Sequence, residues 1–374
     1  MSDIVQWNEA DTRHQAEWRS ENGSPLPRKV QVADDRINAD QAYKLVCEGT
    51  ALLWRGDFQN ARQLLQALTR RIERKAKTYT GSNLLEAFHF QRQMQVQRVR
   101  ILSMLLIAVE PDYSIALRRA PDLQLAFNEA FGAPASAFVM PLRELQGLIG
   151  AHEWRKNGIP IPALGASIHP HYRVFAPTRN EYIDLLVQAE LPPKARTAFD
   201  IGTGTGVLAA VLAQRGLASV VATDQEARAI SCAKDNLQRL GLSHQVQLQQ
   251  VDLFPEGKAD VIVCNPPWLP CRPSSRLEAA IYDPESRMLC GFLNGVAAHL
   301  TPHGQAWLVL SDLAERLGMR SREQLNDWIK AAGLQVKTRL DTRPRHRRAQ
   351  DQADPLHAVR SNEVVSLWVL QLAR

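Results

Sequence analysis

Apolar residues recur at helical spacing through the first part of the chain, after a polar beginning. Residues 1–36 are mostly polar, and we expect them to form an N-terminal arm. Apolar positions then repeat every three to four residues over 40–72, in two runs separated at Gly56, which predicts a pair of antiparallel helices. Two more helical patterns follow, at about 83–109 and 121–131. Residues 37–165 are therefore predicted to form an all-helical domain.

After Gly165, short apolar segments alternate with helical patterns. The predicted strands are 197–201, 219–223, 246–251, 259–264, 305–310, 334–340 and 364–372. The predicted helices between them are about 206–215, 226–240, 286–300 and 321–332. Because this alternation is typical of crossover units, residues 166–374 are expected to form an α/β domain with a seven-stranded, mostly parallel, doubly wound sheet. Residues 341–362 carry no helical pattern long enough for a crossover, so the last strand is predicted to be antiparallel.

Composition adds the class of protein and its compartment. The length of 374 residues suits two domains, and 45% hydrophobic with 22% charged residues excludes wholesale disorder and a fibrous protein. A net charge of +6 permits an acidic partner such as RNA without requiring one. No apolar run reaches the length of a membrane span, and the polar start lacks the pattern of a signal peptide. We therefore expect a cytoplasmic protein with no membrane partner.

The cysteines and histidines show no pattern of a disulfide framework or a metal site. The chain has five scattered cysteines without a CxxC pair, at Cys47, Cys232, Cys264, Cys271 and Cys290. Such a set is typical of reduced thiols. Three histidines, His152, His169 and His171, lack a metal-ligand spacing with any carboxylate or cysteine, so we expect them to be ordinary side chains and no metal to be bound.

A glycine-rich turn follows the first predicted strand of the sheet, in the sequence Phe199-Asp200-Ile201-Gly202-Thr203-Gly204-Thr205-Gly206-Val207. Alternating glycines let the backbone approach a ligand closely, and in an open parallel sheet this turn lies at the carboxyl ends of the strands, where ligands bind. Asp224 ends the second strand, about 20 residues further on. Its carboxylate is suited to accept both ribose hydroxyls of a nucleoside cofactor, and Asp252 after the third strand to accept from an adenine amine. The competing interpretation is that both acids only cap helices or turns.

The fourth predicted strand ends in the sequence Asn265-Pro266-Pro267-Trp268. Two prolines fix φ and supply no N–H groups, so this turn is rigid and leaves backbone carbonyls free. The side-chain oxygen of Asn265 and the carbonyl of Pro266 are then placed to accept from one NH2 group, while Trp268 offers a flat face for a planar amide or base. Such a clamp would act on a planar NH2 group by positioning it and by stabilising positive charge on its nitrogen, without a strong general base.

The glycine turn with its acidic partners resembles that of the class I S-adenosylmethionine-dependent methyltransferases. The NPPW turn is similar to the (N/D)PP(F/Y/W) signature of amino-methyltransferases. Within that group, residues from about 170 to 372 resemble the HemK-type glutamine methyltransferases of release factors and ribosomal protein. The resemblance also includes the segments 172–179, 280–284 and 291–295. Those enzymes usually carry Tyr where this chain has Trp268.

The resemblance implies a Rossmann-like fold, S-adenosylmethionine as cofactor and a role for each matching residue. The implied cofactor-binding residues are Asp200, Gly202, Thr203, Gly204, Thr205, Gly206, Asp224, Asp252 and Leu253. The implied catalytic residues are Asn265, Pro266, Pro267 and Trp268, and the implied substrate rim consists of Phe175, Pro177, Thr178 and Arg179. Residues 37–165 are implied to be a substrate-recognition domain.

Three functions remain open on these grounds. The first is methylation of a protein glutamine amide, in a release factor or ribosomal protein. The second is methylation of an adenine or guanine amine in ribosomal or transfer RNA, which the larger ring of Trp268 keeps open. The third is a nucleotide-binding module without catalysis. Two basic clusters bear on an RNA partner: Arg343, Arg345, His346, Arg347 and Arg348 in a predicted loop, and Arg70, Arg71, Arg74, Lys75 and Lys77 at a helix end. The alternative for both clusters is a solvated basic surface or a helix C-terminus.

Overall fold

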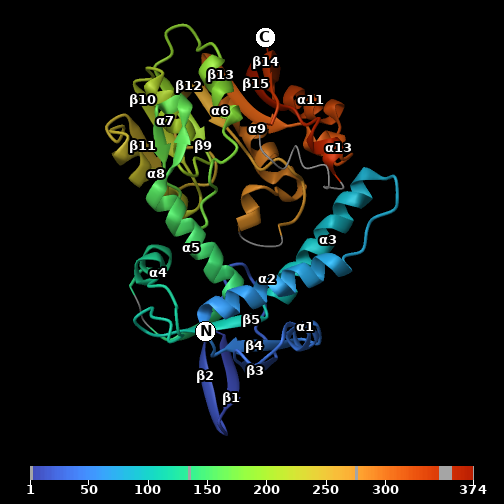
Figure 1. The fold of residues 1–374 in the computed structure, drawn as a ribbon. Helices are drawn as coiled ribbons and strands as arrows, with labels where there is room; N and C mark the ends of the chain where they lie inside the picture. The colour runs from blue at the N-terminus through green and yellow to red at the C-terminus, as the bar shows by residue number, and fades with distance from the viewer. Residues whose placement is uncertain (1–2, 134–135, 274–276, 345–355, 374) are drawn as a thin grey trace. The chain divides into compact units, whose positions relative to one another are not determined.

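The chain divides into two compact units in the computed structural model, which describes residues 3–133, 136–273, 277–344 and 356–373. The first unit consists of residues 1–81 and 89–153, and the second of residues 82–88 and 154–374. The division falls within the helix Leu142–Asn157, ahead of the predicted boundary at residue 165. Figure 1 labels the elements of both units.

The first unit is built on a six-stranded mixed sheet in the order β1-β2-β6-β5-β4-β3. Its strands are β1 (Ile4–Glu9), β2 (Thr12–Trp18), β3 (Lys29–Ala33), β4 (Thr50–Trp54), β5 (Leu105–Val109) and β6 (Phe138–Pro141). Its helices are α1 (Ala39–Cys47), α2 (Phe58–Lys75), α4 (Gln124–Phe131), the larger part of α3 (Leu84–Leu102) and most of α5 (Leu142–Asn157). Strands β3, β4 and β5 are parallel neighbours, as the crossings through α1 and through α2 and α3 require.

Two expectations for this part of the chain are wrong. Residues 37–165 are not all-helical, because Thr50–Trp54 and Leu105–Val109 form β4 and β5. Every residue of β4 is buried, and a strand buried on both faces reads as a continuous apolar run, which periodicity alone does not distinguish from a helix. Residues 1–36 are not an arm, because they form β1, β2 and β3. Val5 and Trp7 are the buried face of β1.

The second unit contains the seven-stranded sheet that the sequence predicts, in the order β11-β10-β9-β12-β13-β15-β14. Its strands are β9 (Thr197–Ile201), β10 (Ser219–Thr223), β11 (Val246–Gln249), β12 (Ala259–Cys264), β13 (Leu300–Ser311), β14 (Leu334–Thr342) and β15 (Val365–Leu372). The first five are parallel to one another, and β15 lies antiparallel between β13 and β14. The predicted antiparallel last strand is confirmed.

Helices cover both faces of this sheet (Figure 1, green through red). They are α6 (Glu181–Gln188), α7 (Val207–Gln214), α8 (Ala227–Arg239), α9 (Arg287–His299), α10 (Leu313–Arg316), α11 (Arg322–Ala331) and α13 (His357–Arg360). Short elements complete the unit: β7 (Ile159–Ile161), β8 (Ala166–Ile168) and the 3-10 turns Pro162–Leu164, Leu277–Ala280 and Pro284–Ser286. Alternate residues of β12 belong to opposite cores, Val261 and Val263 with α6 and α7, Ile262 and Cys264 with α9 and α11.

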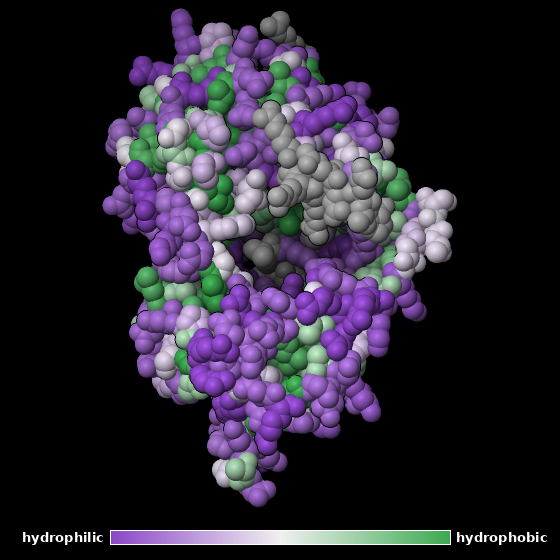
Figure 2. Space-filling view, viewed as in Figure 1, coloured by the Kyte–Doolittle hydropathy of each residue, from purple (hydrophilic) through white to green (hydrophobic). Residues whose placement is uncertain are grey.

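The surfaces visible in Figure 2 are mainly hydrophilic, and the large exposed apolar side chains are few and dispersed along the chain. None of the helices in the described residues combines the length and the apolar character that a membrane span requires.

Candidate cofactor and methyl-acceptor site

The register of three neighbouring strands brings the predicted cofactor and acceptor residues to one edge of the sheet. Ile201 at the end of β9 is paired with Thr223 of β10 on one side and with Cys264 of β12 on the other. The next residues along the chain are Gly202, Asp224 and Asn265, so all three leave the sheet side by side. The glycine turn, its acidic partner and the NPPW turn therefore form one site at the carboxyl ends of the parallel strands.

The glycine turn is fixed by backbone conformation and by close neighbours. Gly202 and Gly206 have φ of 73° and 82°, in the left-handed region that favours glycine. A Cβ atom on Gly202 would lie 2.5 Å from the terminal methyl of Met288 on α9, and one on Gly206 would lie 3.1 Å from the Cβ of Ala233 on α8. The N–H of Thr203 donates to the carbonyl of Thr223 at 2.8 Å. The turn is thus held against α8, α9 and the end of β10.

Asp200 contacts the glycine turn through its buried carboxylate. Its carboxylate is completely buried and accepts from the Thr203 hydroxyl at 2.6 Å and from the Ala209 N–H at 3.0 Å. The other carboxylate oxygen has no hydrogen-bond partner among the described residues. Burial raises the pKa of Asp200 to about 7, against the opposing effect of its two hydrogen bonds. Asp200 therefore ties the turn to the start of α7; contact with a cofactor stays a prediction.

The two other predicted acids differ in their surroundings. Asp224 is partly buried, and its oxygens accept from the N–H groups of Gly204 at 3.0 Å and Glu226 at 2.9 Å. Burial raises its pKa. Each carboxylate oxygen has capacity for a further bond, so Asp224 retains sites for two hydroxyl groups. Asp252 is exposed and forms an ion pair with Arg287 of α9 at 2.8 Å. Leu253 follows it with φ of 62°.

In the NPPW turn, the Asn265 side chain has a defined orientation. The indole Nε1–H of Trp268 donates to the Asn265 Oδ1 at 2.9 Å. Because an indole N–H cannot accept, the atom facing it must be the amide oxygen and not the NH2 group. That oxygen has a second lone pair for an N–H of a substrate. The Trp268 ring is partly buried and packs against the cores on both faces of the sheet, so the donor is itself held in place.

Tyr182 on α6 is a site residue that sequence reasoning missed. The side chain is buried, and the pKa of its hydroxyl is raised by burial and by the Asp200 charge, while a hydrogen bond from the Asn265 side chain opposes the rise. Asn265 therefore interacts with both Trp268 and Tyr182. Tyr182 reads in the sequence as an ordinary apolar position of a helix face, and it gave no separate signal.

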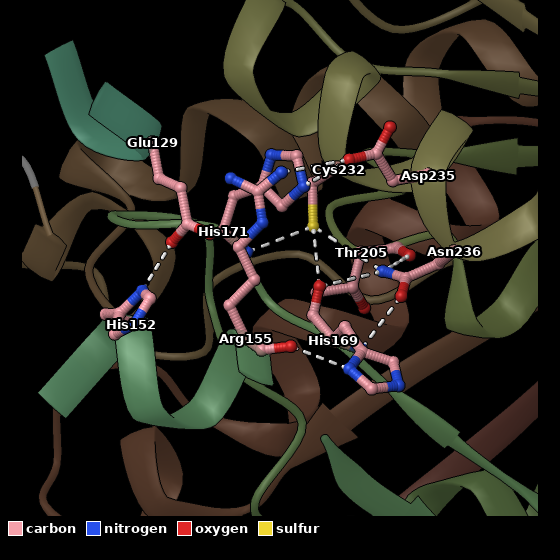
Figure 3. Close-up of polar contacts among 9 residues, drawn as sticks. All are labelled: Glu129, His152, Arg155, His169, His171, Thr205, Cys232, Asp235 and Asn236. Atoms are coloured by element: carbon pink, nitrogen blue, oxygen red, sulfur yellow. Dashed lines mark hydrogen bonds and ion pairs between the residues drawn. The ribbon is translucent and has the colours of Figure 1, made fainter. Parts of the chain in front are cut away.

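A polar network fastens the segment before the glycine turn to α8 (Figure 3). The Asn236 side chain accepts from the His169 backbone N–H at 2.8 Å and donates to the Thr205 carbonyl at 3.0 Å. Sequence reasoning missed Asn236 too. A signal was available, because Asn236 lies at helical spacing from Cys232 and Ala233 on the buried face of α8. A polar residue on an apolar helix face indicates a partner in the core.

The three histidines make local contacts. His171 Nε2 lies 2.9 Å from Asp235, and His169 Nδ1 lies 2.7 Å from the Arg155 carbonyl. In the first unit, His152 Nδ1 lies 2.8 Å from Glu129. Within the residues that the structure describes, no three His, Cys, Asp or Glu side chains are grouped as a metal site.

The predicted substrate rim follows β8. Phe175 is exposed, and the Thr178 N–H donates to the Ala176 carbonyl at 2.7 Å. Arg179 forms an ion pair at 3.5 Å with Glu363, a completely buried carboxylate that also accepts from the Ser311 hydroxyl at 2.6 Å. Ser311 ends β13, so Arg179 is anchored at the same edge of the sheet as the glycine and NPPW turns. A contact of these four residues with substrate remains a prediction.

The basic clusters differ in what the structure describes. Of the loop cluster, Arg343 is exposed, and Arg345, His346, Arg347 and Arg348 lie outside the described residues. In the helix cluster, Arg71 pairs with Asp40 at 2.8 Å and the Lys75 ammonium lies 4.6 Å from the centre of the Tyr43 ring. Both belong to the C-terminal half of α2, where cations complement the helix dipole. RNA contact by either cluster stays a prediction.

Comparison with known proteins identifies the second unit. A family model described as the methyltransferase small domain matches residues 167–331. The release factor glutamine methyltransferase of Rhodopirellula baltica is 31% identical over 200 residues, which cover 46% of this chain and 67% of that protein. Its counterpart in Cereibacter sphaeroides is 30% identical over 164 residues, with 40% and 56% covered. Ribosomal protein L11 methyltransferase of Tolumonas auensis is 31% identical over 125 residues, with 33% and 43% covered. The chain spans about half the length of the curated relatives it matches.

The residues at the strand ends fit the cofactor of this family. Gly204 has φ of 55°, and a Cβ atom on it would meet nothing within 4 Å, so the turn is open at this position. The Asp224 carboxylate retains acceptor capacity at the end of β10. An S-adenosyl nucleoside has ribose hydroxyls for that carboxylate, and Asn265 leaves β12 directly beside the turn. The chain therefore belongs to the class I S-adenosylmethionine-dependent methyltransferases, in the group that includes the release factor glutamine methyltransferases.

Proposed function

We propose that this protein transfers a methyl group to a planar NH2 nitrogen, and that its acceptor is the side-chain amide of a glutamine in a protein. The observation that carries the proposal is the Asn265 oxygen. The Trp268 indole fixes its orientation, and strand register places it next to the glycine turn. Such an oxygen selects a group that donates an N–H, as an amide or an exocyclic amine does, and it disfavours a carboxylate, which has no hydrogen to donate.

The chemistry follows from where the acceptor nitrogen is held. Bound S-adenosylmethionine supplies an activated methyl group on a sulfonium. Asn265 Oδ1 and the Pro266 carbonyl accept hydrogen bonds from the two N–H groups of the acceptor, which orients its nitrogen lone pair toward the methyl group. These two oxygens also stabilise the positive charge that develops on the nitrogen. The proton then leaves to solvent once the nitrogen is alkylated, so the site needs positioning and not a strong base.

A protein acceptor is favoured over RNA by the relatives. The two matched glutamine methyltransferases are named for a release factor, and the third relative for ribosomal protein L11. Two of the five basic side chains of the helix cluster, Arg71 and Lys75, have partners within their own unit. An RNA acceptor would instead be bound by several unpaired cations.

The proposal is tested by Asn265→Ala. Removing the amide should lower the rate of methyl transfer by about 100-fold or more, because the acceptor nitrogen loses its alignment. Binding of S-adenosylhomocysteine, measured by calorimetry, should change little. The matched control is Asn362→Ala, which removes an exposed amide from the same unit. Undiminished transfer by the Asn265 variant would overturn the proposed role of the NPPW turn.

A further inference from the structure

Two nitrogens of the buried Arg320 guanidinium have no hydrogen-bond partner among the described residues. Arg320 lies between α10 and α11, and only 4% of its surface is exposed. Its Nε and Nη2 atoms are buried and have no hydrogen-bond partner among the described residues. No ion pair within the described part of the chain includes it either. Leaving two buried donors without acceptors costs free energy, so these two nitrogens are a candidate binding group.

The described acids whose charges act on Arg320 are engaged elsewhere. Asp283 accepts from the backbone N–H groups of Met288 and Leu289 at the start of α9. Glu315 accepts from Arg322 at 2.7 Å. Burial lowers the pKa of Arg320, with the charges of Glu315, Cys290 and Asp283 opposing and that of Arg322 adding to the effect. The guanidinium remains a cation at neutral pH, because its reference pKa is above 12.

Arg320 lies beside the segment that follows the NPPW turn. The sulfur of its neighbour Met319 is 3.9 Å from the sulfur of Cys271, three residues after Trp268. In the same segment the Leu269 carbonyl accepts from the Asp283 N–H at 2.8 Å. A ligand of Arg320 would therefore lie next to the turn that holds the methyl acceptor.

The two unpartnered nitrogens define the shape of the ligand. In a guanidinium, the Nε–H bond and one Nη2–H bond lie along the same edge and point in parallel. This edge matches the two oxygens of a carboxylate or a phosphate in a bidentate pair. One planar or tetrahedral oxyanion satisfies both donors at once.

The surrounding charges favour a carboxylate over a nucleic acid. The neighbouring cations Arg316 and Arg322 are already paired, with Asp312 and Glu315, at 2.7 Å each. A polyanionic backbone engages several free cations, whereas a single carboxylate needs one. We propose that Arg320 binds a carboxylate of the protein methyl acceptor, close in sequence to the glutamine that is methylated. This inference rests on the proposed function and adds a specificity determinant to it.

The test uses a series of end-blocked, fluorescein-labelled octapeptides. Each contains one glutamine and one aspartate, and the aspartate occupies a different position in each peptide. Each peptide is compared with a control in which asparagine replaces the aspartate. One further peptide has a free C-terminal carboxylate and an amidated counterpart. Binding to the full chain is measured by anisotropy with S-adenosylhomocysteine present. We expect one carboxylate position to bind about tenfold or more tightly than its neutral counterpart, as charge-assisted hydrogen bonds provide.

Arg320→Met should reduce that ratio to near one, and Arg316→Gln, which removes an exposed cation from the same segment, should preserve it. Arg320→Met should unfold at the same temperature as the wild type or higher, because a buried unpaired charge is removed. No preference for a carboxylate at any position, or a preference that survives in Arg320→Met, would overturn the inference. The inference would also be overturned if the binding of an RNA hairpin depended on Arg320 and the binding of the peptides did not. A wild type that binds the aspartate peptide through Arg320 but methylates no peptide would overturn only the proposed function.

Discussion

Trp268 replaces the tyrosine that the resemblance leads one to expect, and the structure gives the replacement a physical meaning. A tyrosine hydroxyl both donates and accepts, whereas an indole N–H only donates. The 2.9 Å contact with Asn265 therefore fixes which end of the Asn265 amide faces the indole. The sequence predicts Asn265, Pro266 and Trp268 as a clamp from their spacing. It does not predict this bond, because the bond depends on how the turn folds back on itself.

Asp200 provides a pH-dependent contribution to stability. Its pKa rises to about 7 in the folded protein, from a reference near 3.8, because the carboxylate is buried. Between about pH 4 and pH 7, the folded state therefore holds a proton that the unfolded chain has released. The stability from this group is complete below about pH 4 and is lost as the pH rises towards 7. Over this pH range, the free energy of unfolding of Asp200→Asn should therefore fall less than that of the wild type. The difference between the two should be on the order of a few kcal/mol.

Denaturant unfolding of wild type and variant at several pH values measures the difference. Asp224, Asp283 and Glu363 also have pKa values raised by burial, but they contribute equally to both proteins and cancel. Asp327→Asn, which removes an exposed carboxylate of α11, serves as the control. Parallel pH profiles for wild type and Asp200→Asn would show that Asp200 is ionised in the folded state.

At the scale of elements, α8 positions the glycine turn through a single side chain. Asn236 binds the Thr205 carbonyl and both backbone groups of His169. We expect Asn236→Leu, which keeps the volume and removes the hydrogen bonds, to destabilise the protein by about 2 kcal/mol or more, because buried backbone groups lose their partners. Cofactor binding should weaken with it, since the turn is no longer held.

Thermal unfolding and calorimetry with S-adenosylhomocysteine check both effects. Asn362→Leu removes an exposed amide of the same unit and should change neither. Unaltered cofactor affinity in a destabilised Asn236→Leu would show that the network supports the fold without shaping the turn.

At the scale of the whole chain, the sequence predicts helices and strands correctly where segments with helix periodicity are separated from segments with strand periodicity by turns. In the second unit, glycines and polar turns divide strands from helices, and β9, β10 and β12 begin and end where the pattern predicts. In the first unit, Leu105–Val109 follows α3 after only two residues, and the apolar run continues through both. The hairpin of β1 and β2 turns at Ala10 and Asp11, with φ of 49° and 62°, without the glycine that usually marks such a turn.

The site shows the same division between local and long-range information. The glycine turn, Asp224 and the NPPW turn were predicted because each is a contiguous motif at a strand end. Tyr182 and Asn236 were not, because each contacts residues that are far away in the sequence. Their roles depend on register and packing, which a single sequence does not encode in local spacing.

The central claim is that the chain methylates a glutamine amide of a protein through the NPPW turn. The most direct measurement incubates the protein with methyl-labelled S-adenosylmethionine and a fractionated cell extract, and then divides the product between protease and nuclease. The claim predicts that protease releases the label and that nuclease does not. Mass spectrometry should locate the methyl group on a glutamine side chain, and Asn265→Ala should fail to transfer it. Label released by nuclease, or label that Asn265→Ala transfers as well as the wild type, would contradict it.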